Sequence, residues 1–242
     1  MLKLFTKLAY WETKPEPREE DRLEIKFVFP GRMLSDARLR VHMHPFGFTR
    51  TYSPRQVNNV YFDTPDLDAL QTNEAGVARR MKVRVRWYGG IEHMLQPVLE
   101  LKVKSGLTGR KLQYPLAKDF DLSAERWQTL TRLVRSALPS SMLHYSSFAS
   151  IPALLNSYQR EYYASGEGTI RVTVDHGIRS YDQRFSARAN LRQESIGPDL
   201  VVVEFKAGMA EEAVLRRATS SFGWRISRNS KYVRGLLPDY LY

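Results

Sequence analysis

Charged side chains occupy every second position in five segments of this sequence, and these residues carry its chemistry. The polar positions are Arg22, Glu24 and Lys26; Arg80, Lys82, Arg84 and Arg86; Glu100, Lys102 and Lys104; Arg171, Thr173 and Asp175; and Glu204 and Lys206. Residues between them are apolar, such as Met81, Val83 and Val85 in the second segment. Successive side chains of a strand point to opposite faces, so each segment predicts a strand with one apolar and one charged face. Several such faces turned inward would form a lumen suited to a polyanion.

The segment Arg80–Arg86 presents four cations along one strand face. Burying them without counter-charge would cost several kcal/mol per unpaired ion by order of magnitude, so something negative must reach them. The alternative is an exposed basic face, such as an RNA-binding surface. Five alternating segments in one compact chain favour the inward arrangement.

Four carboxylates lie among these cations: Glu24, Glu100, Asp175 and Glu204. Each suits an internal salt bridge, and each also suits a divalent metal, which takes hard oxygen ligands and bridges carboxylates to phosphate oxygens. Glu204 is the strongest metal candidate, because its strand, VVVEFK, is otherwise largely apolar.

Length and composition limit the possibilities. A chain of 242 residues with 43% hydrophobic residues can form one domain over 1–242, with a core at about 22–237 after a lead-in at 1–21. Its net charge of +11 favours an anionic partner: nucleic acid, phosphate compounds or an acidic membrane surface. The absence of cysteine excludes disulfides and thiolate chemistry. The start, MLKLFTKLAYW, is a poor signal peptide, and no segment suits a transmembrane helix, so we expect a cytoplasmic protein.

The pattern predicts an α+β fold: an eight-stranded β-barrel with helices packed outside. Strands are expected at 22–29, 57–62, 78–88, 97–104, 110–116, 153–163, 169–174 and 200–206, and helices at 35–44, 67–75, 123–138 and 210–222. Ser123 is expected to cap its helix, and the serine-rich segment 139–150 to form a mobile loop.

Eight short motifs follow one another in an order that resembles a known family. They are Glu24-Ile25-Lys26-Phe27, Asn59-Val60-Tyr61-Phe62-Asp63-Thr64, Lys82-Val83-Arg84-Val85-Arg86-Trp87-Tyr88, Leu99-Glu100-Leu101-Lys102, Tyr158-Gln159-Arg160, Ile170-Arg171-Val172-Thr173-Val174-Asp175, Val203-Glu204-Phe205-Lys206 and Ser230-Lys231-Tyr232. Together they resemble the VTC domain, the polyphosphate polymerase branch of the triphosphate tunnel metalloenzymes (CYTH-like superfamily). The related tunnel phosphatases begin with an E-x-E-x-K pattern, and Arg22 at its first position agrees better with the VTC branch.

The resemblance implies an antiparallel eight-stranded β-barrel whose lumen is a tunnel, in which cations hold a triphosphate and a carboxylate holds Mn²⁺ or Mg²⁺. Combined with the alternating charges, it assigns a catalytic role to Lys26, Arg84, Arg86, Lys102 and Arg171. It assigns substrate binding to Lys82, Lys111, Arg160, Lys206, Arg228, Ser230 and Lys231. It assigns metal binding to Glu204, Glu24 and Glu100.

The implied activity is transfer of the γ-phosphate of ATP to a polyphosphate chain, with ATP and polyphosphate as partners and no specific nucleic acid. Two alternatives remain open: hydrolysis of tripolyphosphate or a nucleoside triphosphate, and a non-catalytic module that binds polyphosphate or an RNA 5′ end. From the chain length we expect neither the regulatory SPX domain nor the membrane anchor of the family. GLTGRK at 106–111 lacks the spacing of a P-loop, and the five histidines show no paired metal-ligand spacing.

Overall fold

A computed structural model describes residues 22–105 and 108–239. The expected lead-in at 1–21 lies outside these residues. One large antiparallel sheet dominates the fold, with the strand order β1-β10-β9-β8-β2-β3-β5-β6. Its strands are β1 (Arg22–Pro30), β2 (Thr49–Asp63), β3 (Arg79–Tyr88), β5 (Val98–Ser105), β6 (Thr108–Pro115), β8 (Ile151–Ala164), β9 (Arg171–Asp182) and β10 (Leu200–Gly208). A separate pair joins β4 (His93–Met94) and β7 (Phe120–Asp121).

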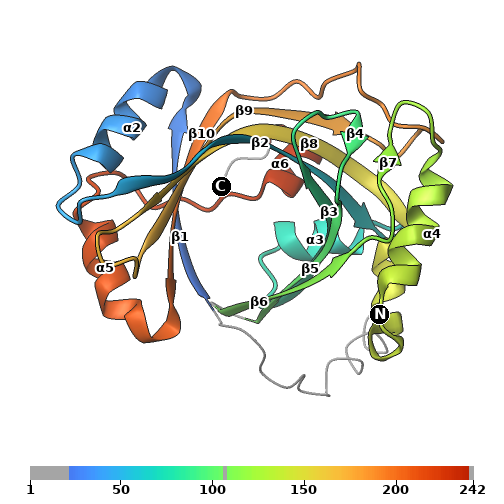
Figure 1. Cartoon of the computed structure of the whole chain (residues 1–242), viewed down its shortest axis with the longest axis horizontal. Helices are drawn as coiled ribbons and strands as arrows, with labels where there is room; N and C mark the ends of the chain where they lie inside the picture. Colours follow the sequence, from blue (N-terminus) through green and yellow to red (C-terminus); the bar gives the residue numbers. More distant parts are fainter. Residues whose placement is uncertain (1–21, 106–107, 240–242) are drawn as a thin grey trace.

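The predicted α+β fold with a large antiparallel sheet of eight strands is confirmed, but the sheet curves without closing, so the predicted barrel is not shown. Strands β1 and β6 end the strand order, and no backbone ladder joins them in the described part of the chain. The curvature nevertheless brings them near each other (Figure 1). The Glu24 carboxylate of β1 lies 2.7 Å from the Lys102 ammonium of β5. Charge alternation specifies which face is inside, whereas closure also requires the end strands to meet in hydrogen-bonding register.

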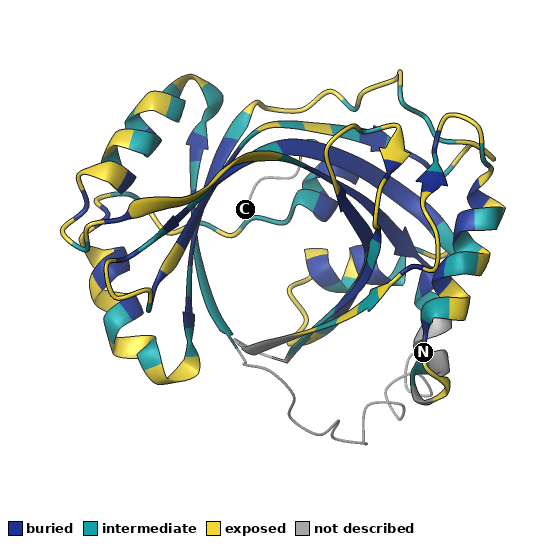
Figure 2. Ribbon diagram, in the orientation of Figure 1, coloured by how far each residue is buried: buried dark blue, intermediate teal, exposed yellow. Residues whose placement is uncertain are grey.

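Three helices cover the outer face of the sheet (Figure 1). The apolar side chains of the strands pack against them there. Helices α2 (Leu34–His42) and α5 (Glu212–Ser220) pack on β1, β9 and β10 around a buried cluster that includes Phe27, Phe205 and Phe222. Helix α4 (Trp127–Ala137) covers the other half through Trp127 and Leu130. The strands are largely buried, while the outward surfaces of the helices are exposed (Figure 2).

Two short helices correct the prediction that every helix packs outside. Helices α3 (Asp68–Glu74) and α6 (Lys231–Leu236) form a third buried cluster with the sheet. In it, the ring of Tyr61 stacks on Tyr232 of α6 with 5.1 Å between centroids. The Tyr61 hydroxyl accepts a hydrogen bond from Arg84, so this contact lies on the charged face. Helix α6 therefore brings its N-terminal residues to the inner side of the sheet.

Two local expectations were also wrong. Helix α4 begins at Trp127, and the Ser123 hydroxyl donates to Asp121 instead of capping a helix. Asp121 offers that hydroxyl a closer acceptor within a local turn. The segment expected as a loop contains a 3₁₀ helix, η3 (Ser140–Ala149). Two further 3₁₀ turns, η2 (Gly31–Met33) and η4 (Met209–Glu211), precede α2 and α5.

Asp63 ties α3 and α6 to the end of β2. Its carboxylate accepts hydrogen bonds from the amides of Thr64, Ala69 and Leu70 at 2.7, 2.8 and 2.9 Å, and from the Tyr232 hydroxyl at 2.5 Å. Asp63→Ala leaves these donors buried without a partner, so the free energy of unfolding should fall by about 2–4 kcal/mol. Denaturant unfolding measures this change. Asp66→Ala, an exposed carboxylate in the same turn, is the control, and an equal effect of both substitutions would contradict the assignment.

Candidate functional site

The inner face of the curved sheet gathers cations from most of its strands and from helix α6. Alternation along the strands and the register between them place these side chains on one face. The cations of this face include Lys26, Arg80, Lys82, Arg84, Arg86, Lys102, Lys104, Lys111, Arg160, Lys206 and Lys231. The four carboxylates between them are Glu24, Glu100, Asp175 and Glu204. The face therefore carries a large excess of positive charge.

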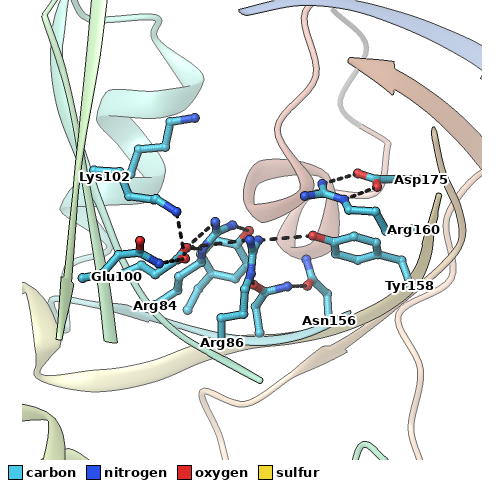
Figure 3. A network of polar contacts seen from close by, with 12 residues as sticks. Arg84, Arg86, Glu100, Lys102, Asn156, Tyr158, Arg160 and Asp175 are labelled. Atoms are coloured by element: carbon cyan, nitrogen blue, oxygen red, sulfur yellow. Dashed lines mark hydrogen bonds and ion pairs between the residues drawn. The ribbon is translucent and has the colours of Figure 1, made fainter. Parts of the chain in front are cut away.

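Two arginines of β3 project side by side into this face (Figure 3). Arg84 donates to one Glu100 oxygen through Nε at 2.8 Å and Nη2 at 2.5 Å. Arg86 donates to Asn59 Oδ1 at 2.9 Å and to the Tyr158 hydroxyl at 3.3 Å. Asn59 is held in turn by Asn156, whose Oδ1 accepts its amide at 2.9 Å. Each guanidinium is thus oriented by fixed acceptors before a ligand arrives.

Glu100 is the common counter-ion of the arginine pair. Its second oxygen accepts from Gln113 at 3.0 Å and from Lys111 at 3.4 Å. Burial alone would raise the pKa of Glu100, but the charges of Arg84 and Arg86 lower it well below its ordinary value. Glu100 therefore stays ionised across the physiological pH range.

A second group joins β8, β9 and α6. Arg160 donates to both oxygens of Asp175, at 2.6 and 2.7 Å (Figure 3). The Lys231 ammonium lies 2.6 Å from the same carboxylate. The ring of Tyr158 lies beneath both cations, 4.7 Å from the Lys231 nitrogen. Burial raises the pKa of the Tyr158 hydroxyl, but the positive charges of Arg160 and Arg86 together have the larger effect and lower this pKa to about 8.

Lysines and two glutamates form the third group, where β1, β5 and β10 approach one another. Glu204 lies between Lys26 at 3.2 Å and Lys206 at 2.7 Å. Lys102 donates to both oxygens of Glu24, at 2.7 and 2.8 Å. Although burial and Glu204 raise the pKa of Glu24, the lysines lower it to about 2.

A cleft of about 740 Å³ opens beside this third group. We call it the lysine cleft; its charged lining residues are Glu24, Lys26, Glu74, Arg80, Lys82, Lys102, Lys104 and Arg228. Ser230, the N-cap residue of α6, lies at its wall, where its hydroxyl accepts from the Lys82 ammonium at 2.8 Å. Burial lowers the pKa of Lys82 well below its ordinary value, and the positive charges of Lys26 and Lys102 lower it further.

Two carboxylates of the inner face, Glu24 and Glu204, have the chemistry needed to bind a divalent cation between them. Glu24 and Glu204 lie on neighbouring strands, and the charge of Glu204 raises the pKa of Glu24, which reflects their mutual repulsion. A cation between them would relieve this repulsion. The described residues contain no group of three or more metal-ligating side chains, so phosphate oxygens and water would complete the coordination, as Mg²⁺ favours. Glu100 has cationic and amide partners on all sides and fits a counter-ion better than a ligand.

Most predicted site residues lie together, and two lie at the margin. Arg171 is exposed at the start of β9, where it pairs in register with Lys206. Arg228 is exposed at the lysine cleft. Sequence reasoning assigned no role to Asn59, Asn156 or Tyr158, although two of them lie in quoted motifs. The sequence feature that could have identified them is a polar side chain within a strand segment that is otherwise largely apolar.

Lys102 should make anion binding depend on pH. Burial lowers its pKa, Glu24 raises it, and Lys26 and Lys206 lower it again, to about 8. A bound polyanion favours the protonated form, so tripolyphosphate affinity should fall by about tenfold from pH 7 to pH 9 on account of this one lysine. Arginine keeps its charge over this range. The ratio of the affinity at pH 7 to the affinity at pH 9 should therefore be about tenfold smaller in Lys102→Arg than in the wild type. Titration of Tyr158 affects both proteins alike and leaves this comparison unchanged. Calorimetric titration at both pH values tests this, and equal ratios in the two proteins would exclude Lys102 as the titrating group.

Comparison with known proteins gives one family match. The model of the VTC domain matches residues 21–238. No curated protein matches this chain. Among solved structures, the PH1819 protein from Pyrococcus horikoshii OT3 is similar at 14% identity and a TM-score of 0.49, over 89% of this chain and 97% of that chain. The Schizosaccharomyces pombe Mediator head module gives 9% identity and a TM-score of 0.36, over 83% and 90% of the two chains. None of the helices in residues 22–105 and 108–239 has the length and apolar character needed to cross a membrane.

Proposed function

This chain belongs to the VTC domain family, and we propose that it is a metal-dependent polyphosphate polymerase that transfers the γ-phosphate of ATP to a polyphosphate chain. The observation that carries the proposal is the convergence of many cations, with four carboxylates among them, on one inner face. A triphosphate carries several negative charges along a slender chain. Cations on opposite walls of a curved sheet can contact that chain from several sides at once.

The arginines suit the triphosphate itself. Arg84 and Arg86 of β3 and Arg160 of β8 each use some of their N–H groups in the hydrogen bonds described above. Their other N–H groups are available to phosphate oxygens. Guanidinium groups bind phosphate oxygens in pairs of parallel hydrogen bonds, which fixes orientation as well as charge. Because Glu100, Asn59 and Asp175 already hold them in place, little side-chain entropy is lost when phosphate binds.

The lysines suit the charge that develops during transfer. The bond between the γ-phosphorus and the bridging oxygen breaks, a bond to a terminal oxygen of the acceptor forms, and ADP leaves with the electron pair. A phosphate acceptor is already an anion, so the step needs no general base from the protein. Lys26, Lys206 and Lys102 would stabilise the spreading negative charge through preorganised electrostatics.

Glu204, with Glu24, would hold the Mn²⁺ or Mg²⁺ that the family implies, and such an ion would neutralise phosphate charge there. The lysine cleft gives a growing chain a route away from this point, because it is open and lined by cations. Chain growth requires such a route, since each transfer lengthens the product.

Incubation of the protein with ATP and Mn²⁺, followed by gel analysis of the phosphate products, tests the proposal. Long phosphate chains that require both protein and metal are the expected result. Release of orthophosphate without chain growth would replace the proposal with hydrolysis, the second candidate activity. Tight binding of ATP or polyphosphate without any turnover would indicate a binding module instead.

A further inference from the structure

Three tyrosines, two of them exposed and one half-buried, surround one arginine at the end of the inner face that lies away from the lysine cleft. The Arg55 guanidinium lies 5.2 Å from the ring centre of Tyr52 and 5.8 Å from those of Tyr88 and Tyr162. The rings of Tyr52 and Tyr162 meet edge to face at 5.7 Å. We call these four residues the tyrosine cluster.

The tyrosine cluster is exposed although it is rich in aromatic surface. Tyr52 is 58% exposed and Tyr88 is 45% exposed. The first half of β2, which carries Tyr52 and Arg55, is exposed throughout (Figure 2). Among the described residues, Arg55 has these three rings as its partners and no carboxylate within ion-pair distance. An open group of π faces around an unneutralised cation is a surface that a flat, electron-rich ligand can cover.

Strand register places the tyrosine cluster directly beside the arginines of the candidate site. Arg55 is paired with Arg160, and Tyr162 lies two residues beyond Arg160 on the same face of β8. Tyr88 likewise lies two residues beyond Arg86 on β3. At the other end of β3, Arg80 pairs with Lys104 of the lysine cleft, roughly 26 Å away at about 3.3 Å per residue. The site therefore has an aromatic end and a lysine end.

The chain deviates from regular strand geometry at the same place. The pairing of β2 with β8 shifts register between Arg50 and Tyr52 and again between Tyr52 and Arg55. Such irregularities re-aim side chains and are frequent next to binding sites. Here they accompany the turning of Tyr52 toward Tyr162.

We propose that the tyrosine cluster is a nucleobase site, on which the purine of a nucleoside triphosphate stacks while its phosphates extend to Arg86 and Arg160. This inference rests on the proposed function and deepens it, because it assigns the base-binding end and makes a nucleotide, not inorganic triphosphate, the preferred ligand. Stacking on aromatic and guanidinium faces is the usual way in which proteins hold unpaired bases. The nucleotide then enters at the tyrosine cluster, and the lysine cleft remains for the phosphate chain.

Calorimetric titration of ATP and of tripolyphosphate, at one pH and one salt concentration, tests the proposal. In the wild type, ATP should bind more tightly than tripolyphosphate. Tyr88→Ala should weaken ATP binding by about tenfold, which corresponds to about 1.4 kcal/mol, and change tripolyphosphate binding by less than about twofold. Tyr52→Ala should act in the same direction, and Tyr88→Phe should bind ATP as the wild type does because the ring remains.

Phe185→Ala is the matched control, since Phe185 is an 85% exposed ring with an arginine over it on another part of the surface. It should alter neither titration. Equal losses of ATP and tripolyphosphate affinity in Tyr88→Ala, or no loss of either, would overturn the nucleobase site and leave the phosphate site intact. A wild-type protein that binds neither compound would instead overturn the proposed function.

Discussion

Replacing Arg84 and Arg86 together with alanine is expected to weaken tripolyphosphate binding by at least about a hundredfold. Hydrogen bonds to charged groups contribute about 1.5–3 kcal/mol each, so the loss of two guanidinium partners amounts to about 3–6 kcal/mol. Both side chains are largely enclosed, with 17% and 10% of their surfaces exposed, so water screens them little. Calorimetric titration with tripolyphosphate gives the dissociation constants.

The double substitution also leaves Glu100 without its principal counter-ions, which would repel an incoming phosphate. The variant Arg84→Ala/Arg86→Ala/Glu100→Gln separates the two effects, because it removes that negative charge as well. We expect it to recover part of the lost affinity but to remain well below the wild type.

Arg132→Ala/Arg135→Ala is the matched control. Both arginines are exposed on α4, which covers the outer face, so this pair changes the net charge by the same amount without touching the inner face. Its tripolyphosphate affinity should stay within about twofold of the wild type. Equal losses in the two double variants would mean that general charge attraction, not the β3 arginines, governs binding.

Period-two alternation predicted most of the strands and the identity of their two faces. Alternation is a local property: Met81, Val83 and Val85 had to share one face, and Lys82, Arg84 and Arg86 the other, whatever the rest of the chain does. The burial of the first set, the ion pairs of Arg84 and Arg86, and the hydrogen bond of Lys82 to Ser230 confirm this prediction. The same pattern carries no information about closure, because a strand looks the same at the edge of an open sheet as within a barrel.

Patterns within single segments of the sequence could not predict contacts between segments that are far apart in the chain. Ser230 and Lys231 were assigned from a resemblance. In the structure they reach the inner face through contacts of α6 with distant segments, such as Tyr232, which packs on Tyr61 and donates to Asp63. The polar support of Arg86 by Asn59 likewise needs two strands in a particular register. Such partners are visible only after the strands have been paired.

The distribution of carboxylates explains how so many cations share one face. Glu100 is shared by two arginines and Lys111, Asp175 by Arg160 and Lys231, and Glu204 by Lys26 and Lys206. Each carboxylate neutralises only part of the charge around it. The remaining repulsion destabilises the ligand-free protein and is relieved when a polyanion binds, so added tripolyphosphate should stabilise the fold.

Glu204→Gln is expected to reduce metal-dependent turnover of ATP by at least about a thousandfold while binding of tripolyphosphate without metal stays equal or becomes tighter. Glu204 is buried, and its carboxylate is the shared partner of Lys26 and Lys206. Glutamine has nearly the same size but no charge, so it removes a hard anionic ligand and frees two ammonium groups for phosphate. Few other roles for this residue predict opposite effects on turnover and on metal-free binding.

Two controls make this result specific. Glu100→Gln removes a buried carboxylate that fits a counter-ion role, so it should lower turnover by less than Glu204→Gln and leave the Mn²⁺ concentration for half-maximal activity unchanged. Glu212→Gln removes an exposed carboxylate of α5 that pairs with Arg216, and it should change neither quantity. Turnover is measured over a range of Mn²⁺ concentrations, and thermal unfolding checks that each variant is folded. A folded Glu204→Gln protein with wild-type activity and wild-type Mn²⁺ dependence would place the metal elsewhere, because no carboxylate would then remain between Lys26 and Lys206 to hold it.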